Sequence, residues 1–223
     1  MPKKTVPAKA EPKIPRQVKS RMVKDSILDA ATELIKTNGY EYVTVNNVCS
    51  LAGVSVGSFY HHFENKDELL AYYLTAAFEK HATEYDEMHG DDVVANVLNC
   101  YSLYADFIID QGVEFTKNYY TTKNKSLGRT QFNTVSRKKV SLPILEKTIE
   151  LLADGVKNGY LLPLTNSEEL GEDLCTIEKG TIFDWAICDG AYNLVTATHR
   201  LLKSHLRAYV TEKYLEQFPE TYA

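Results

Sequence analysis

The chain has 223 residues, of which 44% are apolar and 25% are charged, and its formal net charge at pH 7 is −5. This length and composition suffice for one large domain or two smaller ones, each with a buried core. No apolar run of about 18 residues could form a transmembrane helix, and no apolar segment follows the charged N-terminus as in a secretory signal. The four cysteines are widely spaced, so we expect reduced thiols in a cytoplasmic protein.

Basic residues are concentrated at the start of the chain. Residues 1–24 contain eight lysines and arginines and one acidic residue, Glu11, whereas the remainder is acidic overall. Four prolines fall within the first 15 positions and disfavour a helix, so residues 1–19 are predicted to form a flexible basic tail. Such a tail suits contact with a polyanion, although a tail that is merely solvated has the same composition.

Three helices are predicted after this tail, followed by the start of a fourth. Helical periodicity begins near Ser20 and ends at Asn38-Gly39, where glycine suits the left-handed helix cap. Thr44 can cap a short helix that ends near position 52, and Ser55 can cap another that ends near position 62. Asn65, with Glu68 three residues later, resembles a capping box, and the helix that it opens is expected to reach the late 80s.

The two short helices have the spacing of a helix-turn-helix, because Ala52-Gly53-Val54-Ser55 forms a tight turn between them. The residues expected to pack inward are Val48 and Leu51 on the first helix and Phe59 and Phe63 on the second. In this motif the second helix enters the major groove of DNA. We therefore expect residues 20–66 to form a DNA-binding domain.

The outward face of the second short helix is predicted to contact DNA. Ser58 and Tyr60 can donate hydrogen bonds to phosphates or base edges, and Val56 can contact a thymine methyl group. Gly57 has no side chain, so the helix backbone can approach DNA closely. The predicted contact residues are Thr44, Ser55, Val56, Gly57, Ser58, Tyr60, His61 and Lys66. Structural zinc needs about four ligands, so the pair His61-His62 does not predict a metal site.

The rest of the chain, residues 67–223, is predicted to be a larger domain of amphipathic helices. The expected segments are 92–110, 113–124, 135–157 with a kink at Pro143, 167–189 and 191–215. No segment alternates convincingly between apolar and polar residues with a period of two, so the protein is predicted to be all-α. No catalytic or nucleotide-binding motif is present, and neither an enzyme activity nor a cofactor is expected.

Two groups of residues in this domain are candidates for binding. Seven aromatic residues lie between Tyr101 and Phe132, which is typical either of an ordinary core or of a cavity for a mostly apolar ligand. The predicted pocket residues are Tyr101, Tyr104, Phe107 and Tyr120. The last two helices carry an apolar stripe that one bundle would not cover, which predicts an interface with a second copy. Its predicted residues are Trp185, Leu194, Thr198, Leu201, Leu202, His205 and Tyr209.

The order of short motifs over residues 20–72 resembles the DNA-binding domain of the TetR family of bacterial transcriptional regulators. The matching segments are NGY, T-V-x-x-V, AGVS-x-G-S-F-Y-x-H-F and NKDELL. Val56 is a departure, because a polar or basic residue is common at that position of the family.

This resemblance implies a function as well as a fold. It implies a homodimer, joined through the last two helices, that represses transcription from a pseudo-palindromic operator in double-stranded DNA. A small effector, bound in a cavity of the second domain, would release the protein from DNA. Two alternatives remain open: control by a protein partner in place of a small ligand, and activation in place of repression.

Overall fold

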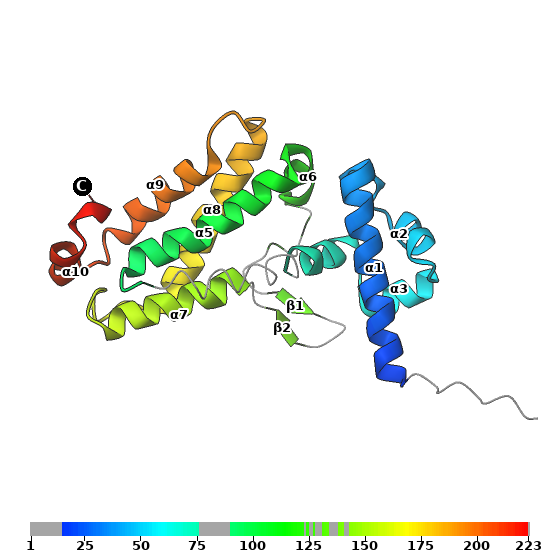
Figure 1. The fold of residues 1–223 in the computed structure, drawn as a ribbon, viewed down its shortest axis with the longest axis horizontal. Helices are drawn as coiled ribbons and strands as arrows, with labels where there is room; N and C mark the ends of the chain where they lie inside the picture. The colour runs from blue at the N-terminus through cyan, green and yellow to red at the C-terminus, as the bar shows by residue number, and fades with distance from the viewer. Residues whose placement is uncertain are drawn as a thin grey trace, which may run out of the picture.

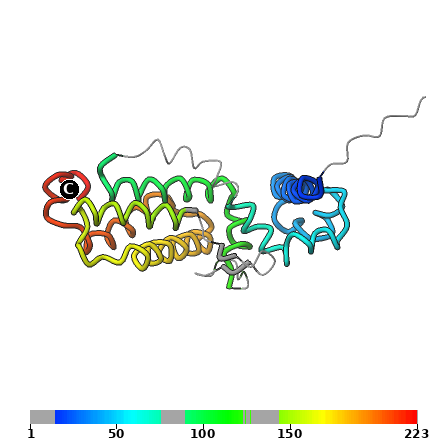
Figure 2. The backbone as a smooth tube through the Cα atoms, turned by 90° about the horizontal axis from the view of Figure 1, so that it is seen from below, coloured from blue at the N-terminus to red at the C-terminus, as the bar shows by residue number. Residues whose placement is uncertain are grey.

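The computed structural model describes residues 15–75, 90–122, 124, 127, 131–133, 138–140 and 143–222. A small group of helices from the N-terminal part lies at one end of the molecule, and a larger helical bundle extends to the C-terminus at the other end (Figures 1 and 2). Within the described residues, no helix is both long enough and apolar enough to cross a membrane.

The N-terminal group consists of four helices and one 3-10 turn. They are α1 (Arg16–Asn38), η1 (Tyr40–Tyr42), α2 (Val45–Ala52), α3 (Val56–His62) and a helix over residues 66–75. The structure describes the predicted long fourth helix only as far as residue 75. α1 begins earlier than expected, directly after Pro15, because the first amides of a helix need no acceptor within it. Residues 16–19 therefore belong to a helix, whereas the tail prediction for residues 1–14 lies outside the described residues.

The core of this group contains most of the side chains predicted to face inward. Val48, Phe59 and Phe63 are at most 1% exposed. The prediction for Leu51 was wrong, because its side chain is 52% exposed. The inward face of α2 is centred on Val48, Cys49 and Ala52, and Leu51 points about 110° away from that centre.

The second domain is a bundle built around one long helix. Its helices are α5 (Val93–Gln111), α6 (Val113–Tyr119), α7 (Pro143–Lys157), α8 (Ser167–Ile187), α9 (Leu194–Leu206) and α10 (Glu212–Gln217), followed by η3 (Pro219–Thr221). α5 packs against α7, α8 and α9, and Figure 1 shows it running between α7 and α9. This central position agrees with the apolar residues found on more than one side of the helix.

Two predicted helices differ from those observed. α7 begins at Pro143, so the predicted kink there is wrong; proline suits the first turn of a helix and disfavours helical geometry in the residue before it. Upstream, β1 (Gln131–Asn133) and β2 (Lys138–Val140) form a short antiparallel pair in which Gln131 lies opposite Val140. The predicted helix 191–215 is divided into α9 and α10, because Thr211 caps α10. The fold nevertheless remains all-α in class, with a small N-terminal domain and a larger helical one.

The C-terminal segment is hydrogen-bonded to the start of α5. Asp92 caps α5 by accepting a hydrogen bond from the Ala95 amide at 2.9 Å. The same carboxylate accepts hydrogen bonds from the hydroxyls of Tyr214 at 2.5 Å and Thr221 at 2.9 Å. One partly buried carboxylate thus joins the start of α5 to α10 and η3.

Candidate nucleic-acid interface and ligand site

The turn between α2 and α3 has the geometry that the sequence predicts. Gly53 ends α2 with φ 66° and ψ 31°, the left-handed conformation that costs an L-residue roughly 1 kcal/mol or more. Its amide donates to the carbonyls of Cys49 and Ser50. The hydroxyl of Thr44 accepts from the Asn47 amide, and that of Ser55 accepts from the Ser58 amide, each at 3.1 Å. Both helices therefore begin at fixed residues.

One face of α3 is exposed and largely free of charge. Val56 is 42% exposed, Tyr60 is 54% exposed, and Gly57 and His61 are exposed beside them. A Cβ atom built on Gly57 would meet only the Ser55 hydroxyl oxygen, at 3.8 Å. The protein itself would tolerate a side chain there, so the absence of one suits a close approach by another molecule.

Two of the predicted DNA contacts, Thr44 and Ser55, serve as caps of α2 and α3. Thr44 and Ser55 use their oxygens as acceptors for capping, and each hydroxyl group also carries a proton. The Ser55 and Ser58 oxygens lie 2.9 Å apart, so one of the two donates to the other. These residues first hold α2 and α3 in place, and they sit at the edge of the exposed face.

Two lysines are held against aromatic rings in this domain. The Lys66 ammonium lies 3.8 Å from the centre of the Tyr40 ring, and burial lowers the pKa of Lys66. The Lys24 ammonium lies 3.6 Å from the centre of the Tyr72 ring, and burial lowers its pKa as well. Each ammonium group thus makes a cation–π contact with a tyrosine ring. Lys24 was counted only with the basic N-terminal residues, and its role against the fourth helix was not foreseen.

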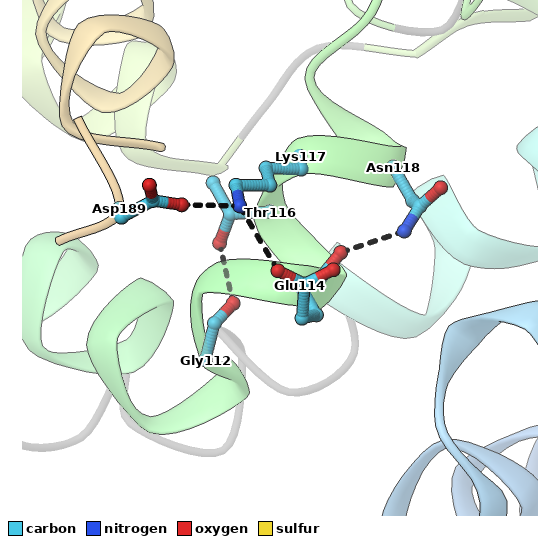
Figure 3. Close-up of polar contacts among 6 residues, drawn as sticks. All are labelled: Gly112, Glu114, Thr116, Lys117, Asn118 and Asp189. Carbon is cyan, nitrogen blue, oxygen red and sulfur yellow. Dashed lines mark hydrogen bonds and ion pairs between the residues drawn. The ribbon is translucent and has the colours of Figure 1, made fainter. Parts of the chain in front are cut away.

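α6 lies between the two domains and contacts both. On one side, the ring of Phe115 meets that of Tyr40 edge-on, with centres 5.8 Å apart. On the other side, Lys117 pairs with Glu114 at 3.0 Å and with Asp189, which follows α8 (Figure 3). The helix is also tied internally by a bond from the Thr116 hydroxyl to the Gly112 carbonyl at 2.9 Å. A shift of α6 would therefore disturb its contacts with η1 and with the residue that follows α8.

The four predicted pocket residues do not surround a single point. The Tyr104 and Tyr120 hydroxyls lie 2.6 Å apart, so these two side chains meet. Tyr101 is buried closer to the N-terminus of α5, where its hydroxyl lies 3.3 Å from the Cys175 sulfur. Phe107 is partly buried at the opposite end, in the core shared with the N-terminal domain. Burial raises the pKa of Tyr101, Tyr104 and Tyr120 well above the ordinary value of tyrosine.

Glu178 on α8 lies close to these tyrosines and was missed from the sequence. It is 1% exposed, and its Oε2 accepts a hydrogen bond from the Thr198 hydroxyl at 2.8 Å. Its other oxygen, Oε1, is buried without a hydrogen-bond partner among the described residues. Burial raises the pKa of Glu178 to about 8. A usable signal was present, since Leu174, Cys175 and Ile182 place position 178 on the apolar face of α8.

The predicted dimer interface requires a correction. Trp185, Leu194, Thr198 and Leu202 are at most 5% exposed and lie in the core of the chain itself, so they cannot form a surface for a second copy. Leu201, His205 and Tyr209 are partly exposed. The large apolar residues exposed on this pair of helices are Phe183 at 46% and Ile187 at 60%. A shallow groove between α8 and α9 includes Gly180, Asp184, Thr196 and Arg200.

Metal ligands do not gather within the described part of the chain. No group of three or more histidine, cysteine, aspartate or glutamate side chains is placed to hold an ion there. His61 and His62 contact each other edge-on, with ring centres 5.1 Å apart. Burial, with smaller contributions from His61 and Lys24, lowers the pKa of His62.

Comparison with known proteins is consistent with this geometry. Residues 27–73 match the family described as bacterial regulatory proteins, tetR family. The chain is 27% identical over 167 residues to the uncharacterized HTH-type transcriptional regulator YhgD of Bacillus subtilis, covering 73% of this chain and 83% of YhgD. It is 38% identical over 58 residues to the uncharacterized HTH-type transcriptional regulator YwcC of the same organism, a match that covers only 26% of each protein.

A solved structure extends the similarity to most of the fold. FadR of Thermus thermophilus, a TetR-family transcriptional repressor solved in complex with lauroyl-CoA, superimposes with a TM-score of 0.69. The alignment covers 85% of this chain and 96% of FadR, at 17% sequence identity. At that identity the likeness concerns the fold.

Proposed function

The chain belongs to the TetR family of transcriptional regulators, and we propose that it is a repressor that binds a pseudo-palindromic operator as a homodimer and leaves it when a small, mostly apolar effector binds. The observation that carries the DNA-binding part is the exposed face of α3 around Gly57. Among the described residues, a Cβ atom at that glycine would meet only the Ser55 hydroxyl oxygen, at 3.8 Å, and the flanking Val56, Tyr60 and His61 side chains are exposed.

In the proposed complex, α3 enters the major groove and reads the operator. Tyr60 and His61 would reach phosphates or base edges, and Val56 would contact a thymine methyl group. Thr44 at the start of α2 and Lys66 at the start of the next helix would contact the phosphate backbone. The exposed cations at the beginning of α1, Arg16 and Lys19, would add to the same attraction, as would the preceding basic residues.

The proposed dimer uses the outer face of α8 and α9. Phe183 and Ile187 lie one turn apart on α8, and large apolar side chains that remain exposed together mark a surface for association. Leu201, His205 and Tyr209 on and after α9 remain part of this proposed surface. Two copies of the helix pair would form a four-helix interface with twofold symmetry, which matches the symmetry of a pseudo-palindromic site.

Effector binding would act through α6. Aromatic rings connect the region of Tyr104 and Tyr120 with the DNA-binding domain: the Phe115 ring stacks on that of Tyr119, with centres 5.7 Å apart, and meets that of Tyr40 at 5.8 Å, and the Tyr40 ring contacts the Lys66 ammonium. A ligand that binds beside Tyr104 and displaces α6 would disturb Lys66 and the spacing of the two α3 helices. Release requires that the ligand prefer the displaced state, because equal affinity for both states shifts nothing. The lauroyl-CoA complex of FadR, which shares this fold, supports a ligand with a long apolar part.

The function is tested with DNA selected from a random pool by the full-length protein. Tyr60→Ala should weaken binding to the selected duplex by roughly tenfold or more, because a contact to phosphate or base is lost. A matched control is Leu164→Ala, which truncates a side chain that is 99% exposed in the other domain and should bind like the parent. If Tyr60→Ala and the parent protein bind the selected duplex with equal affinity, the proposed contact between α3 and DNA is wrong.

A further inference from the structure

A groove with a basic lining lies between α5, α9 and the C-terminal turn. Its volume is about 780 Å³, which is within the range of sites for small molecules. α5 contributes the apolar side chains of Ala95 and Leu98, and the C-terminal segment contributes η3 and the Tyr222 ring. None of the four predicted pocket residues lines this groove. It is therefore a separate space from the region of Tyr104 and Tyr120.

The basic side chains of the groove come from α9 and from the residue that ends it. They are His199, Arg200, Lys203 and Arg207. Both arginines are exposed, and Lys203 is partly buried between them. The two arginines are seven residues, or about 10 Å, apart along the helix. Glu220 is the one carboxylate among the described lining residues, so three permanent cations share the groove with a single anion.

These three cations are not neutralised within the described part of the chain. None of the ion pairs found there involves Arg200, Lys203 or Arg207. The Asp92 carboxylate, at the start of α5, instead accepts hydrogen bonds from the Ala95 amide and from two C-terminal hydroxyls. Like charges three or four residues apart on a helix repel each other by a few tenths of a kcal/mol. An anion in the groove would relieve that repulsion.

Two of the cations are positioned by the same aromatic ring. The Lys203 ammonium lies 5.4 Å from the centre of the Tyr222 ring, and the Arg207 guanidinium carbon lies 5.2 Å from it. The Tyr222 ring in turn meets that of the buried Tyr214 edge-on, with centres 6.3 Å apart. Cation–π contacts restrict the two long side chains before a ligand arrives, which lowers the entropy lost on binding.

Contact with the operator does not account for this row of cations. Figure 1 shows α10, and with it the end of α9, at the opposite end of the molecule from α1, α2 and α3. Charges in solution are screened over about 8 Å at physiological ionic strength, so operator phosphates held by α3 would not be felt here. The row calls for a different anion.

We propose that this groove binds a small molecule that carries two phosphate groups on an apolar or aromatic body. The guanidinium groups of Arg200 and Arg207 present planar forks of donors that match phosphate oxygens, and Lys203 adds a point charge between them. One carboxylate would meet only part of a row about 10 Å long, whereas two phosphates can meet all three cations. The body would lie against Ala95 and Leu98. The site is additional to the effector region and does not depend on the proposed function.

The experiment compares ADP, inorganic pyrophosphate and adenosine by titration calorimetry on the full-length protein at pH 7 and low salt. ADP and pyrophosphate should bind, and ADP should bind more tightly because its body covers the apolar lining. Adenosine, which has the body without the charges, should not bind detectably. The affinity of both anions should fall as salt is added.

Two variants locate the binding in the groove. Lys203→Gln and Arg207→Gln should each weaken ADP and pyrophosphate roughly three- to tenfold, because a charged hydrogen bond is lost at a partly solvated site. The matched control is Lys213→Gln, which should bind like the parent. The Lys213 ammonium has the same charge and lies 4.8 Å from the centre of the Tyr160 ring, but Lys213 does not line the groove.

A conservative variant separates loss of charge from loss of structure. Arg207→Lys keeps the charge without the fork, so it should bind pyrophosphate more tightly than Arg207→Gln does. The inference is overturned if neither ADP nor pyrophosphate binds at millimolar concentration. It is also overturned if Lys213→Gln weakens them as much as Lys203→Gln, which would be a response to net charge alone. If the parent binds a hexaglutamate peptide more tightly than ADP, and Lys203→Gln loses that affinity, the groove belongs to an acidic peptide and the inference is wrong.

Discussion

Replacing Glu178 by glutamine should stabilise the protein at alkaline pH and have little effect at acid pH. The pKa of this carboxyl group is about 8 in the folded chain, against an ordinary value of 4.5. Between these two pH values the folded state holds a proton that the unfolded state has lost, so stability falls as pH rises. The favourable contribution is complete below pH 4.5 and is lost as the pH passes through about 8.

The size of the effect follows from the two pKa values. Their separation of about 3.5 units, at about 1.36 kcal/mol per unit, corresponds to roughly 5 kcal/mol between pH 4.5 and pH 8. The groups packed around the carboxyl stay neutral over this range. The pKa values of Tyr101, Tyr104, Tyr120 and Cys175 are all raised by burial, and Thr198 does not titrate. Glu178 is therefore expected to dominate the local pH dependence.

Urea unfolding of the parent, Glu178→Gln and the control Glu216→Gln, which removes an exposed carboxylate on α10, at pH 5.0 and pH 8.5 measures this quantity. Glu178→Gln should differ little from the parent at pH 5.0 and should be more stable by several kcal/mol at pH 8.5. Glu216→Gln should show no such difference between the two pH values. If Glu178→Gln changes the free energy of unfolding equally at both, the carboxyl group titrates normally and the account of its burial is wrong.

Three other predictions concern DNA binding and assembly. Lys66→Ala should weaken operator binding and reduce the slope of log affinity against log salt by about one. The control is Lys157→Ala, which removes an exposed lysine on α7; if the two variants have the same slope, Lys66 does not contact a phosphate. Deletion of residues 1–14 should weaken DNA binding and make it less dependent on salt, with dimerisation intact, and unchanged affinity at low salt would show that these residues are not involved. Ile187→Glu should give folded monomers in sedimentation, whereas Leu202→Ala should instead lower the free energy of unfolding by about 2–5 kcal/mol; a stable dimer of Ile187→Glu would refute the interface.

The helix-turn-helix was predictable because its signals are local. The Thr44 and Ser55 caps and the left-handed Gly53 act within a few residues, and each was found where the sequence placed it. The role of Gly57 in DNA contact stays a prediction, to which the structure adds that a Cβ atom there would meet only the Ser55 hydroxyl oxygen, at 3.8 Å, among the described residues. The start of α7 at Pro143 was equally local in origin, but the apolar periodicity around the proline was given too much weight.

The residues of the second domain were harder to assign, because periodicity shows which face of a helix is apolar and not what covers it. The stripe that includes Leu194 and Leu202 was assigned to a second copy of the chain, and it is the chain's own helices that cover it. Glu178 was overlooked for a related reason, since a charged residue is usually expected at the surface. Only the packing of α5, α8 and α9 shows that its carboxyl group is enclosed.

In vitro selection of DNA by the full-length protein, followed by sequencing of the bound pool, tests the central claim most directly. A homodimer that presents two α3 helices should enrich sites with two inverted half-sites about one helical turn or somewhat more apart, and Tyr60→Ala should fail to enrich them. Enrichment of a single unrepeated half-site, or no enrichment by the parent protein, would contradict the account.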